Sequence, residues 1–527
     1  MSSGVSLARC PRPATRPDAA LLAALVGLLG GVLVELVPVG GGDLVAQRWW
    51  QSWAASGGGQ PVDLAWYAGS PAVSYSLLAP WVLAAAGPAV AGVLSSGAGA
   101  WATTRLLVRA GATRPRVVAV ASALTFLADQ ISGRTTFAMG AAVGLLALLV
   151  AGRPGPGTAG RWVAAGLLAA VAGALSPVAG VFVGLAAVAW WVAVARRSRC
   201  GLAVAALLVG AAAPLAAMLL LGAAGGPMTG SAHQMLAAAL AGAVVLAVAG
   251  PRLPVVRAGA ALTVLALLAA WLVPDPMGSN TTRLVLLFAV PVLVAVPGRP
   301  ALLVGLAAAL VTWLLPPLVP RDLVPRDTTA VERAAAPVLA ELAHRAPVGR
   351  VEVVPLADHS DAAMGSQVPL ARGWTRQLDV ARNPLFYDGT LDAGSYLAWL
   401  RARGVSYVAL AERRPDWAGR AEAALVRRGV PGLDRVWSDG TWSLYAVDGP
   451  GVVLSGEAEV RRSDRQAMEV AVGGAGDVVL ALFWDDRLTL VGDGCLEPGP
   501  VEGTVRVRAA GAGPLTVTSA WRPSGHC

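Results

Sequence analysis

The residues of this sequence that could do chemistry gather just after its first long hydrophobic stretch. Two acids, Asp43 and Asp63, lie within residues 40–87, among tryptophans and tyrosines. A carboxylate that reaches a hydroxyl group can remove its proton as a general base. Aromatic rings with one polar edge are typical of membrane interfaces and of surfaces that hold sugars. Asp43 and Asp63 are therefore the candidate catalytic residues.

Four other side chains of this segment are candidate substrate-binding residues: Gln47, Trp66, Tyr67 and Tyr75. Connections longer than about 12–15 residues are usually functional or disordered, and the aromatic content argues against disorder. We expect two short helices here. One, over 43–56, would lie along the membrane surface, and the other, over 74–87, would be interfacial or re-entrant.

Each acid also has a structural interpretation. Asp43 stands where it could cap the helix expected over 43–56, and Asp63 could brace the loop. Glu35 falls in the last turns of the preceding hydrophobic stretch. It could extend to the membrane surface, because a carboxylate costs less near the end of a span than at its centre. The sequence leaves these alternatives open.

Two arginines are the candidate ligands of an anion. Arg134 and Arg283 each fall at the end of a predicted membrane span, and Asn280 shortly precedes Arg283. The planar guanidinium fork matches the oxygens of a phosphate. These residues could therefore bind a lipid-linked phosphate. Pairing of the arginines with Asp129 or Asp43, or contact with lipid headgroups, is the competing interpretation.

The elements that must position these residues are membrane helices. Of the 527 residues, 56% are hydrophobic and only 14% are charged, whereas about 25% charged residues is usual for soluble domains. The net charge is +9, but the basic residues are all arginine and many of them separate hydrophobic runs. Membrane topology explains this pattern better than a nucleic-acid partner does.

About eleven stretches are apolar enough to be membrane helices, since about 20 apolar residues span the hydrocarbon core. They lie at residues 19–39, 88–108, 116–128, 135–151, 162–175, 177–195, 201–222, 233–250, 255–273, 283–297 and 300–317. The sequence thus predicts a polytopic α-helical membrane domain over residues 19–318.

The arginines also orient the chain in the plasma membrane. Most of them fall in the N-terminal segment 1–18 and in alternate loops, as expected for the cytoplasmic side. The first hydrophobic stretch is predicted to be an uncleaved helix, with the N-terminus in the cytoplasm. Arg134 and Arg283 then fall on the opposite side. An odd number of crossings places everything after about residue 318 outside the cytoplasm.

The C-terminal part has a different composition from the membrane domain. Residues 319–450 alternate helical and strand patterns, which predicts a small α/β domain. Residues 451–527 alternate apolar and polar side chains between glycine turns, which is typical of a β-sandwich. Cys495 and Cys527 both fall in this last region. An oxidising compartment favours a disulfide between them, with two free thiols as the alternative.

No cofactor is evident from the sequence. It contains four histidines and four cysteines, without the spacings of a zinc site or the motif of a phosphate-binding loop. A metalloenzyme with His or Cys ligands is therefore not expected. A divalent ion held by Asp43 through water molecules would leave no such signature.

Several motifs resemble the GT-C superfamily of integral-membrane glycosyltransferases, and in particular a GT-C-like group from high-GC actinobacteria. The features are a long first outer loop that opens with an acid, about eleven spans and an exported C-terminal part. The motifs are GDLVAQ (42–47), LAWYAGSPAVSYSLLAP (64–80), GRTTFAMG (133–140), SPVAG (176–180), NTTRLVLLF (280–288) and RGWTRQLDVARNPLFYDGTL (372–391). The resemblance covers most of residues 19–450.

This resemblance implies an inverting glycosyltransferase. Such an enzyme would transfer a sugar from a polyprenyl-phosphate donor to a glycan, lipid or protein of the cell envelope, at the outer face of the membrane. Many members of the superfamily carry paired acids in the first outer loop. Here a single acid, Asp43, follows Gly42.

Two other classes of function stay open. A transporter or lipid flippase is expected to show matching halves and helices broken near the membrane midplane, and the sequence shows no matching halves. A non-catalytic GT-C-like scaffold that binds glycans would keep the fold and dispense with the second acid.

Overall fold

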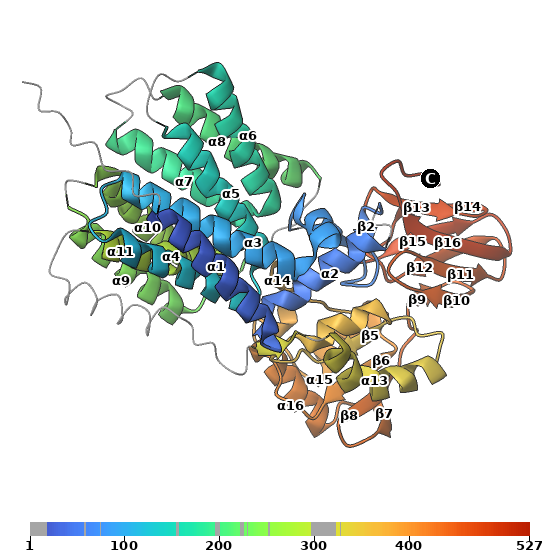
Figure 1. Ribbon diagram of the computed structural model, residues 1–527. Helices are drawn as coiled ribbons and strands as arrows, with labels where there is room; N and C mark the ends of the chain where they lie inside the picture. Colours follow the sequence, from blue (N-terminus) through green and yellow to red (C-terminus); the bar gives the residue numbers. More distant parts are fainter. Residues whose placement is uncertain are drawn as a thin grey trace, which may run out of the picture.

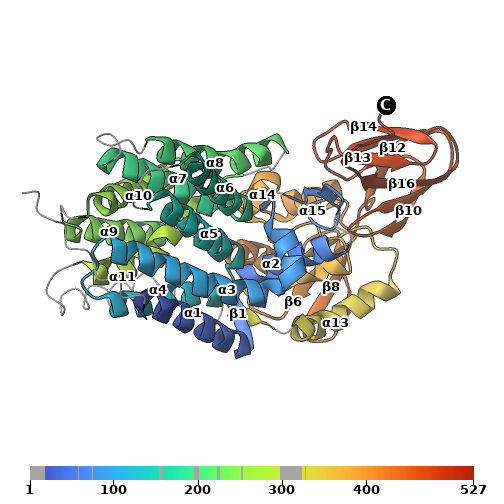
Figure 2. The same cartoon turned by 45° about the horizontal axis from the view of Figure 1, so that its top comes forward.

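The computed structural model describes residues 18–56, 59–73, 75–153, 158–194, 201–221, 226–228, 230–250, 253–296, 323–326 and 328–527. A bundle of apolar helices forms one side of the molecule, and the C-terminal part forms the other (Figures 1 and 2). The bundle contains α1 (Asp18–Leu36), α3 (Ala79–Arg109), α4 (Pro115–Ile131), α5 (Thr135–Ala151), α6 (Ala159–Leu175), α7 (Pro177–Ala193), α8 (Gly201–Leu220), α9 (Ala232–Val248), α10 (Pro254–Leu272) and α11 (Arg283–Ala295).

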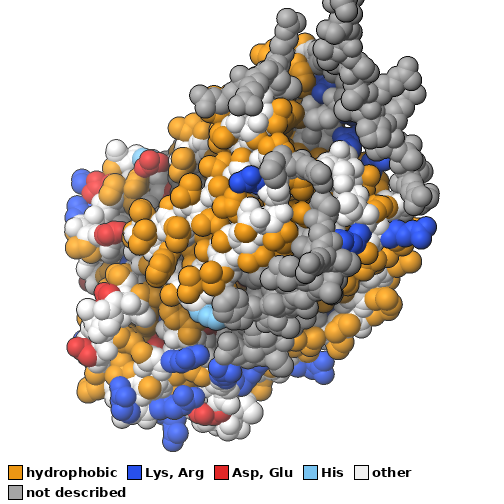
Figure 3. Space-filling view, turned by 90° about the vertical axis from the view of Figure 1, so that its left-hand side faces the viewer, with side chains coloured by type: hydrophobic (Ala, Val, Ile, Leu, Met, Phe, Trp, Pro, Cys, Tyr) orange, Lys and Arg blue, Asp and Glu red, His pale blue; other side chains and the backbone are white. Residues whose placement is uncertain are grey.

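Five helical stretches in the described part of the chain are long and apolar enough to cross a membrane: Ala19–Leu36, Ala79–Arg109, Gly201–Leu220, Pro254–Leu272 and Gly278–Ala295. Four other apolar helices are shorter, with 10–17 residues each. Among the described residues, hydrophobic side chains are extensive over the middle of the face shown in Figure 3, with basic side chains among them. Ten of the predicted spans overlap a helix, and the span predicted at 300–317 lies outside the described residues. The count of eleven crossings stays a prediction.

Small residues let the helices of the bundle approach closely, as is usual where no water drives helix association. Between α1 and α3, a Cβ atom added to Gly27 would lie 2.6 Å from the backbone oxygen of Ser96. One added to Gly97 would lie 2.6 Å from the side chain of Leu28. Larger side chains at either glycine would therefore separate the two helices.

The helix expected over 74–87 is the first arm of α3. The helix begins at Ala79 and is broken at Gly87, whose φ of 78° is unfavourable for residues with a side chain. Pro88 follows, and its ring prevents the regular hydrogen bond at this turn. The short arm before Gly87 and the long arm after it thus form one kinked element.

The first long loop folds between the bundle and the C-terminal part. It contains β1 (Val39–Gly41), α2 (Asp43–Ala55), β2 (Val62–Asp63) and β3 (Ser70–Pro71). Eight of the thirteen residues of α2 are buried, and Trp49 and Trp50 share a core with the α/β domain. Trp53 packs instead with Ala72 and Val73 of the same loop. The helix expected over residues 43–56 is thus present as α2, and its position along the membrane surface stays a prediction.

A polar network ties this loop to the bundle and to the chain that follows the bundle. The Gln130 side-chain amide donates to the backbone oxygen of Gly31 (3.1 Å) and to Glu35 (2.7 Å). The other oxygen of Glu35 accepts from Arg326 at 2.7 Å. Glu35 therefore has specific partners rather than extending into the membrane surface. Arg326 directly follows β4 (Leu323–Pro325), which pairs antiparallel with β1.

The α/β domain has a four-stranded sheet in the order β5-β6-β8-β7. Only the β5–β6 pair is parallel. The strands are β5 (Val351–Val353), β6 (Tyr407–Ala411), β7 (Leu433–Ser438) and β8 (Trp442–Val447), and the helices are α13 (Thr328–His344), α14 (Arg376–Arg382), α15 (Ala393–Ala402) and α16 (Arg420–Arg428).

A buried ionic cluster fixes α14 to this domain. The Arg372 guanidinium donates to Asp379 on α14 at 2.8 Å and to Glu422 on α16 at 2.9 Å. Glu352 lies 3.5 Å from the same guanidinium. Burial and the neighbouring Glu422 raise the pKa of Glu352 well above its usual value. One arginine thus serves three buried carboxyl groups, and the raised pKa of Glu352 favours its uncharged form.

The last region is a β-sandwich of two antiparallel four-stranded sheets, in the orders β10-β11-β16-β13 and β14-β15-β12-β9. The strands are β9 (Val453–Ser455), β10 (Ala458–Ser463), β11 (Met468–Val472), β12 (Gly476–Leu480), β13 (Leu488–Val491), β14 (Gly494–Pro498), β15 (Val505–Ala509) and β16 (Gly513–Ser519). Alternate side chains of both sheets fill the core, as the apolar–polar alternation predicts.

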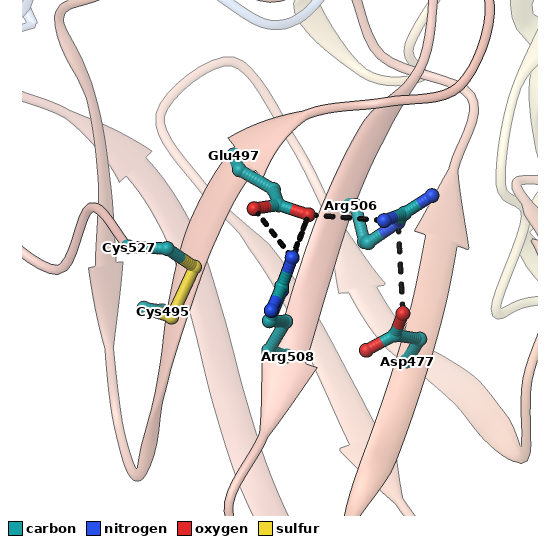
Figure 4. The surroundings of a disulfide bond; sticks show 6 residues. All are labelled: Asp477, Cys495, Glu497, Arg506, Arg508 and Cys527. Carbon is teal, nitrogen blue, oxygen red and sulfur yellow. Dashed lines mark hydrogen bonds and ion pairs between the residues drawn. A yellow bond between two sulfur atoms is a disulfide. The ribbon is translucent and has the colours of Figure 1, made fainter.

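The predicted disulfide joins Cys495 on β14 to Cys527 at the C-terminus (Figure 4). Next to it, Glu497 accepts hydrogen bonds from Arg506 and Arg508 on β15. The disulfide therefore holds the C-terminal segment against the sheet that contains β14.

Loss of this disulfide is expected to destabilise the sandwich. The bond closes a loop with a sequence separation of 32, so replacing both cysteines with serine should lower the unfolding free energy by roughly 3–4 kcal/mol. Thermal unfolding of the purified protein, with and without a reductant, measures this. The reductant should lower the Tm of the wild type and leave that of the Cys495→Ser, Cys527→Ser variant unchanged. Equal Tm values for both proteins would contradict the expectation.

Candidate functional site

Asp43 is the first residue of α2, directly after the strand β1. Gly42 occupies the N-cap position, and no side chain caps this helix. The interpretation of Asp43 as a cap is therefore wrong. Its carboxylate is engaged elsewhere: Oδ2 lies 3.4 Å from Nε of Arg134 and 3.2 Å from Nη2 of Arg283. The structure thus brings together the three charged residues that the sequence singled out.

Two helix N-termini meet at this carboxylate. Asp43 begins α2 and Arg134 directly precedes α5, whereas Arg283 on α11 follows the helical turn Gly278–Thr282. The unpaired N–H groups at a helix N-terminus create a positive potential, which favours anions. Gln47 holds two of these helices together, because its side-chain oxygen accepts from the backbone N–H of Thr136 on α5 at 3.3 Å. The site is therefore electropositive by backbone geometry as well as by its arginines.

A second carboxylate belongs to the same cluster. Asp129 on α4 is buried and interacts electrostatically with Arg134, Arg283 and Asp43. Its Oδ2 atom has no hydrogen-bond partner within the described part of the protein. The sequence suggested Asp129 only as a counter-ion for an arginine. The cluster thus contains two acids and two arginines, and its formal charges balance.

The cluster is open to a ligand on the Asp43 side. The Asp43 side chain is 32% exposed, compared with 23% for Arg134 and 11% for Arg283. Only Oδ2 of Asp43 is engaged by the two arginines, and Oδ1 has no hydrogen-bond partner among the residues that the structure describes. Tyr75 is a hydrogen-bond partner of Arg283 and also stacks on Trp50, at 4.8 Å between ring centroids.

His359 from the α/β domain covers the cluster. A Cβ atom added to Gly42 would lie 2.5 Å from the His359 ring, and His359 interacts electrostatically with Asp43. Burial lowers the pKa of His359 to about 4, so its imidazole is neutral at pH 7. Its backbone has a φ of 58°, and its ring stacks on Trp374 with 3.4 Å between centroids. The sequence offered no signal for this residue, because the contact depends on how two distant segments pack.

Three of the predicted binding residues, Trp66, Tyr67 and Asn280, are buried and contact other parts of the protein. Trp66 is 2% exposed and stacks on Trp49 at 4.0 Å. Tyr67 is 1% exposed, and its hydroxyl donates to the backbone oxygen of Gly373 at 2.6 Å. Asn280 is buried, with its side-chain nitrogen 3.2 Å from the sulfur of Met228. In this structure these residues hold the loop, the bundle and the α/β domain together.

Asp63 is not part of the Asp43 cluster. It accepts a hydrogen bond from the backbone N–H of Ala65 at 3.0 Å and pairs with Arg465 of the β-sandwich at 3.3 Å. The Arg465 guanidinium in turn lies 3.8 Å from the centroid of the Trp49 ring. These contacts match the interpretation of Asp63 as a brace, here between the first loop and the last domain.

An apolar cavity of about 250 Å³ lies within the bundle. Its walls come from α5, α7, α9, α10 and α11. Leu284 and Phe288 are among its lining residues, so the cavity extends along α11 from the residue that follows Arg283. Thr263 is the one lining residue with a polar side chain among those described. The described residues contain no group of three or more His, Cys, Asp or Glu side chains suited to a metal ion.

No protein-family model and no curated protein sequence matches the chain. Among solved structures, it is similar to the arabinofuranosyltransferase AftD from mycobacteria, a mutant of which was solved by single-particle cryo-electron microscopy. The TM-score is 0.47 and the sequence identity is 17%. The match covers 98% of this chain and 60% of the AftD chain, so this chain spans about three fifths of that protein.

The brace at Asp63 is expected to make stability depend on pH. Burial raises the pKa of Asp63 to about 6, from an ordinary value of 3.8. At a pH between these two values, Asp63 is therefore more often protonated in the folded protein than in the unfolded chain. Stability should therefore fall as the pH rises from about 4 to about 6, by at most roughly 3 kcal/mol.

Comparison with Asp63→Asn isolates this contribution, because the other titrating groups are common to both proteins. The Tm of the wild type minus that of the variant should decrease between pH 4 and pH 7. A difference that is constant over this range would show that Asp63 is not the group responsible.

Proposed function

We propose that this protein is an inverting membrane glycosyltransferase that takes its sugar from a polyprenyl-phosphate donor. The observation that carries the proposal is the Asp43 carboxylate, which is 32% exposed and whose Oδ2 atom pairs with Arg134 and Arg283. A general base and two phosphate ligands are what this reaction requires at one place.

In the proposed reaction, Oδ1 of Asp43 accepts the proton of an acceptor hydroxyl. The hydroxyl oxygen forms a bond to the anomeric carbon of the donor while the bond from that carbon to the phosphate oxygen breaks. The leaving phosphate keeps the electron pair. Arg134 and Arg283 stabilise its charge, because charge-assisted hydrogen bonds from arginine to phosphate are strong and can be bidentate.

The ion pairs of Asp43 suit a site at which one anion can replace another. Asp43 and Asp129 balance the charge of the two arginines. A bound phosphate would compete with Asp43 for Arg134 and Arg283, since the phosphate and the carboxylate are drawn to the same guanidinium donors. Asp43 then loses its counter-ions and becomes a stronger base. Donor binding would in this way prepare the carboxylate for the acceptor.

The apolar cavity supports a lipid-linked donor in preference to a nucleotide sugar. It lies along α11 from Leu284, the residue after Arg283, to Val292, and its lining is almost entirely hydrocarbon. An isoprenoid chain in this cavity would place its phosphate near the N-terminus of α11. The bias of arginine toward one set of loops favours the outer face of the plasma membrane for this site, with the α/β domain and the β-sandwich outside the cytoplasm. The acceptor would then be a glycan, lipid or protein of the cell envelope.

Replacing Asp43 with asparagine tests the base. The Asp43→Asn change keeps the size and the hydrogen-bonding oxygen of the side chain and removes its basicity. Transfer of labelled sugar from polyprenyl-phosphate donors in membranes should fall by a factor on the order of 10²–10⁴.

Asp448→Asn is the matched control, because Asp448 is 75% exposed and pairs with Arg401 on the α/β domain. This variant should transfer sugar at the wild-type rate. Undiminished transfer by a well-folded Asp43→Asn protein would exclude Asp43 as the base.

A further inference from the structure

Beside the Asp43 cluster, a strip of aromatic and polar side chains crosses the surface of the α/β domain. It consists of His359, Trp374, Arg376, Tyr387 and Trp417. His359 stacks on Trp374, and the Arg376 guanidinium lies 5.2 Å from the Trp374 ring and 5.0 Å from the Trp417 ring. Tyr387 lies edge-on to Trp417 at 5.8 Å. The strip thus runs continuously from the site to the surface.

Trp417 at the outer end of the strip is exposed and yet held in place. Its side chain is 51% exposed. It begins the short helical turn η6 (Trp417–Gly419), which the Asp416 side chain caps at Ala418. Asp416 also accepts from Arg376 at 2.7 Å, and Arg376 donates to the Tyr387 hydroxyl at 3.0 Å. An exposed indole with this support has little to contribute to the core and is well suited to binding.

The inner end of the strip reaches the cluster by two routes. His359 packs against Gly42, the residue that precedes Asp43. Next to Arg376, the Gln377 side chain donates to the backbone oxygen of Pro276 at 3.1 Å. Pro276 lies shortly before the η2 turn (Gly278–Thr282), which leads into Arg283 and α11. The strip therefore adjoins the residue before Asp43, and its neighbour Gln377 contacts the segment that leads into Arg283.

We propose that this strip binds the acceptor, and that the acceptor is a carbohydrate chain. The inference rests on the proposed function and names the class of acceptor. The apolar face of a sugar ring stacks on an indole, and Trp417 is the exposed indole of the strip. A glycan that stacks on Trp417 would extend along the strip toward Asp43.

The surroundings of Trp417 favour a glycan over a membrane surface. The nearby residues Glu412, Arg413, Arg414 and Arg420 are charged and exposed. Inserting this part of the domain into a bilayer would require removing those charges from water. A carbohydrate chain leaves them hydrated, because it covers only the ring faces.

Glycan binding by the purified full-length protein tests the inference. The probe is a panel of short oligosaccharides of hexoses, pentoses and N-acetylhexosamines, and the comparison is between the wild type, Trp417→Ala and Trp521→Ala. Trp521 is a matched control, because it is 49% exposed and lies in the β-sandwich region. The wild type should bind at least one member of the panel. Trp417→Ala should weaken that binding about tenfold, because a stacking contact is lost, and Trp521→Ala should not.

The outcomes separate this inference from the proposed function. If no member of the panel binds, or if Trp417→Ala binds as tightly as the wild type, the strip is not a glycan site. In that case, a loss of sugar transfer in Asp43→Asn would still support the proposed function, with another kind of acceptor. In an assay of sugar transfer, the Trp417→Ala variant should have a higher KM for the acceptor than the wild type and the same kcat. A protein that binds glycans through Trp417 and transfers no sugar would overturn the proposed function and leave the binding site in place.

Discussion

The shared ion pair of Asp43 with Arg134 and Arg283 is the interaction on which this structure depends. Asp43 and Arg134 come from the N-terminal ends of α2 and α5, and Arg283 comes from α11. Without a carboxylate between them, the two arginines would repel each other. The group is partly buried, so its charges are screened less than those of a surface pair. The same arrangement joins the helices and places two arginines where another anion could replace Asp43 as their partner.

The C-terminal part completes this site rather than simply following the membrane domain. Strand β4 pairs with β1 just before Asp43, and Arg326 binds Glu35 at the end of α1. Trp49 and Trp50 of α2 pack into the core of the α/β domain. Asp63 and Arg465 extend the connection to the β-sandwich. These contacts fix the direction of α2, and they therefore fix the position of Asp43 relative to the helices that carry the arginines.

Much of the architecture could be predicted from the sequence, because it follows from local patterns. Apolar runs predict the helices, and strand alternation together with an oxidising compartment predicts the sandwich and its Cys495–Cys527 bond. Asp43, Arg134 and Arg283 stand out because charge is rare at these positions. What local patterns do not contain is the packing between distant segments. Trp66 and Tyr67 were expected to face a substrate and are buried, and His359 gained its place only through the fold of the α/β domain onto Gly42.

The central claim is that Arg134 and Arg283 hold the phosphate of a polyprenyl lipid, and native mass spectrometry of the purified protein tests it most directly. The wild type should retain a polyprenyl phosphate or its glycosylated form, and a variant with glutamine in place of both arginines should lose it. Retention of that lipid by the double variant would contradict the claim. So would a wild-type protein that carries only ordinary membrane phospholipids.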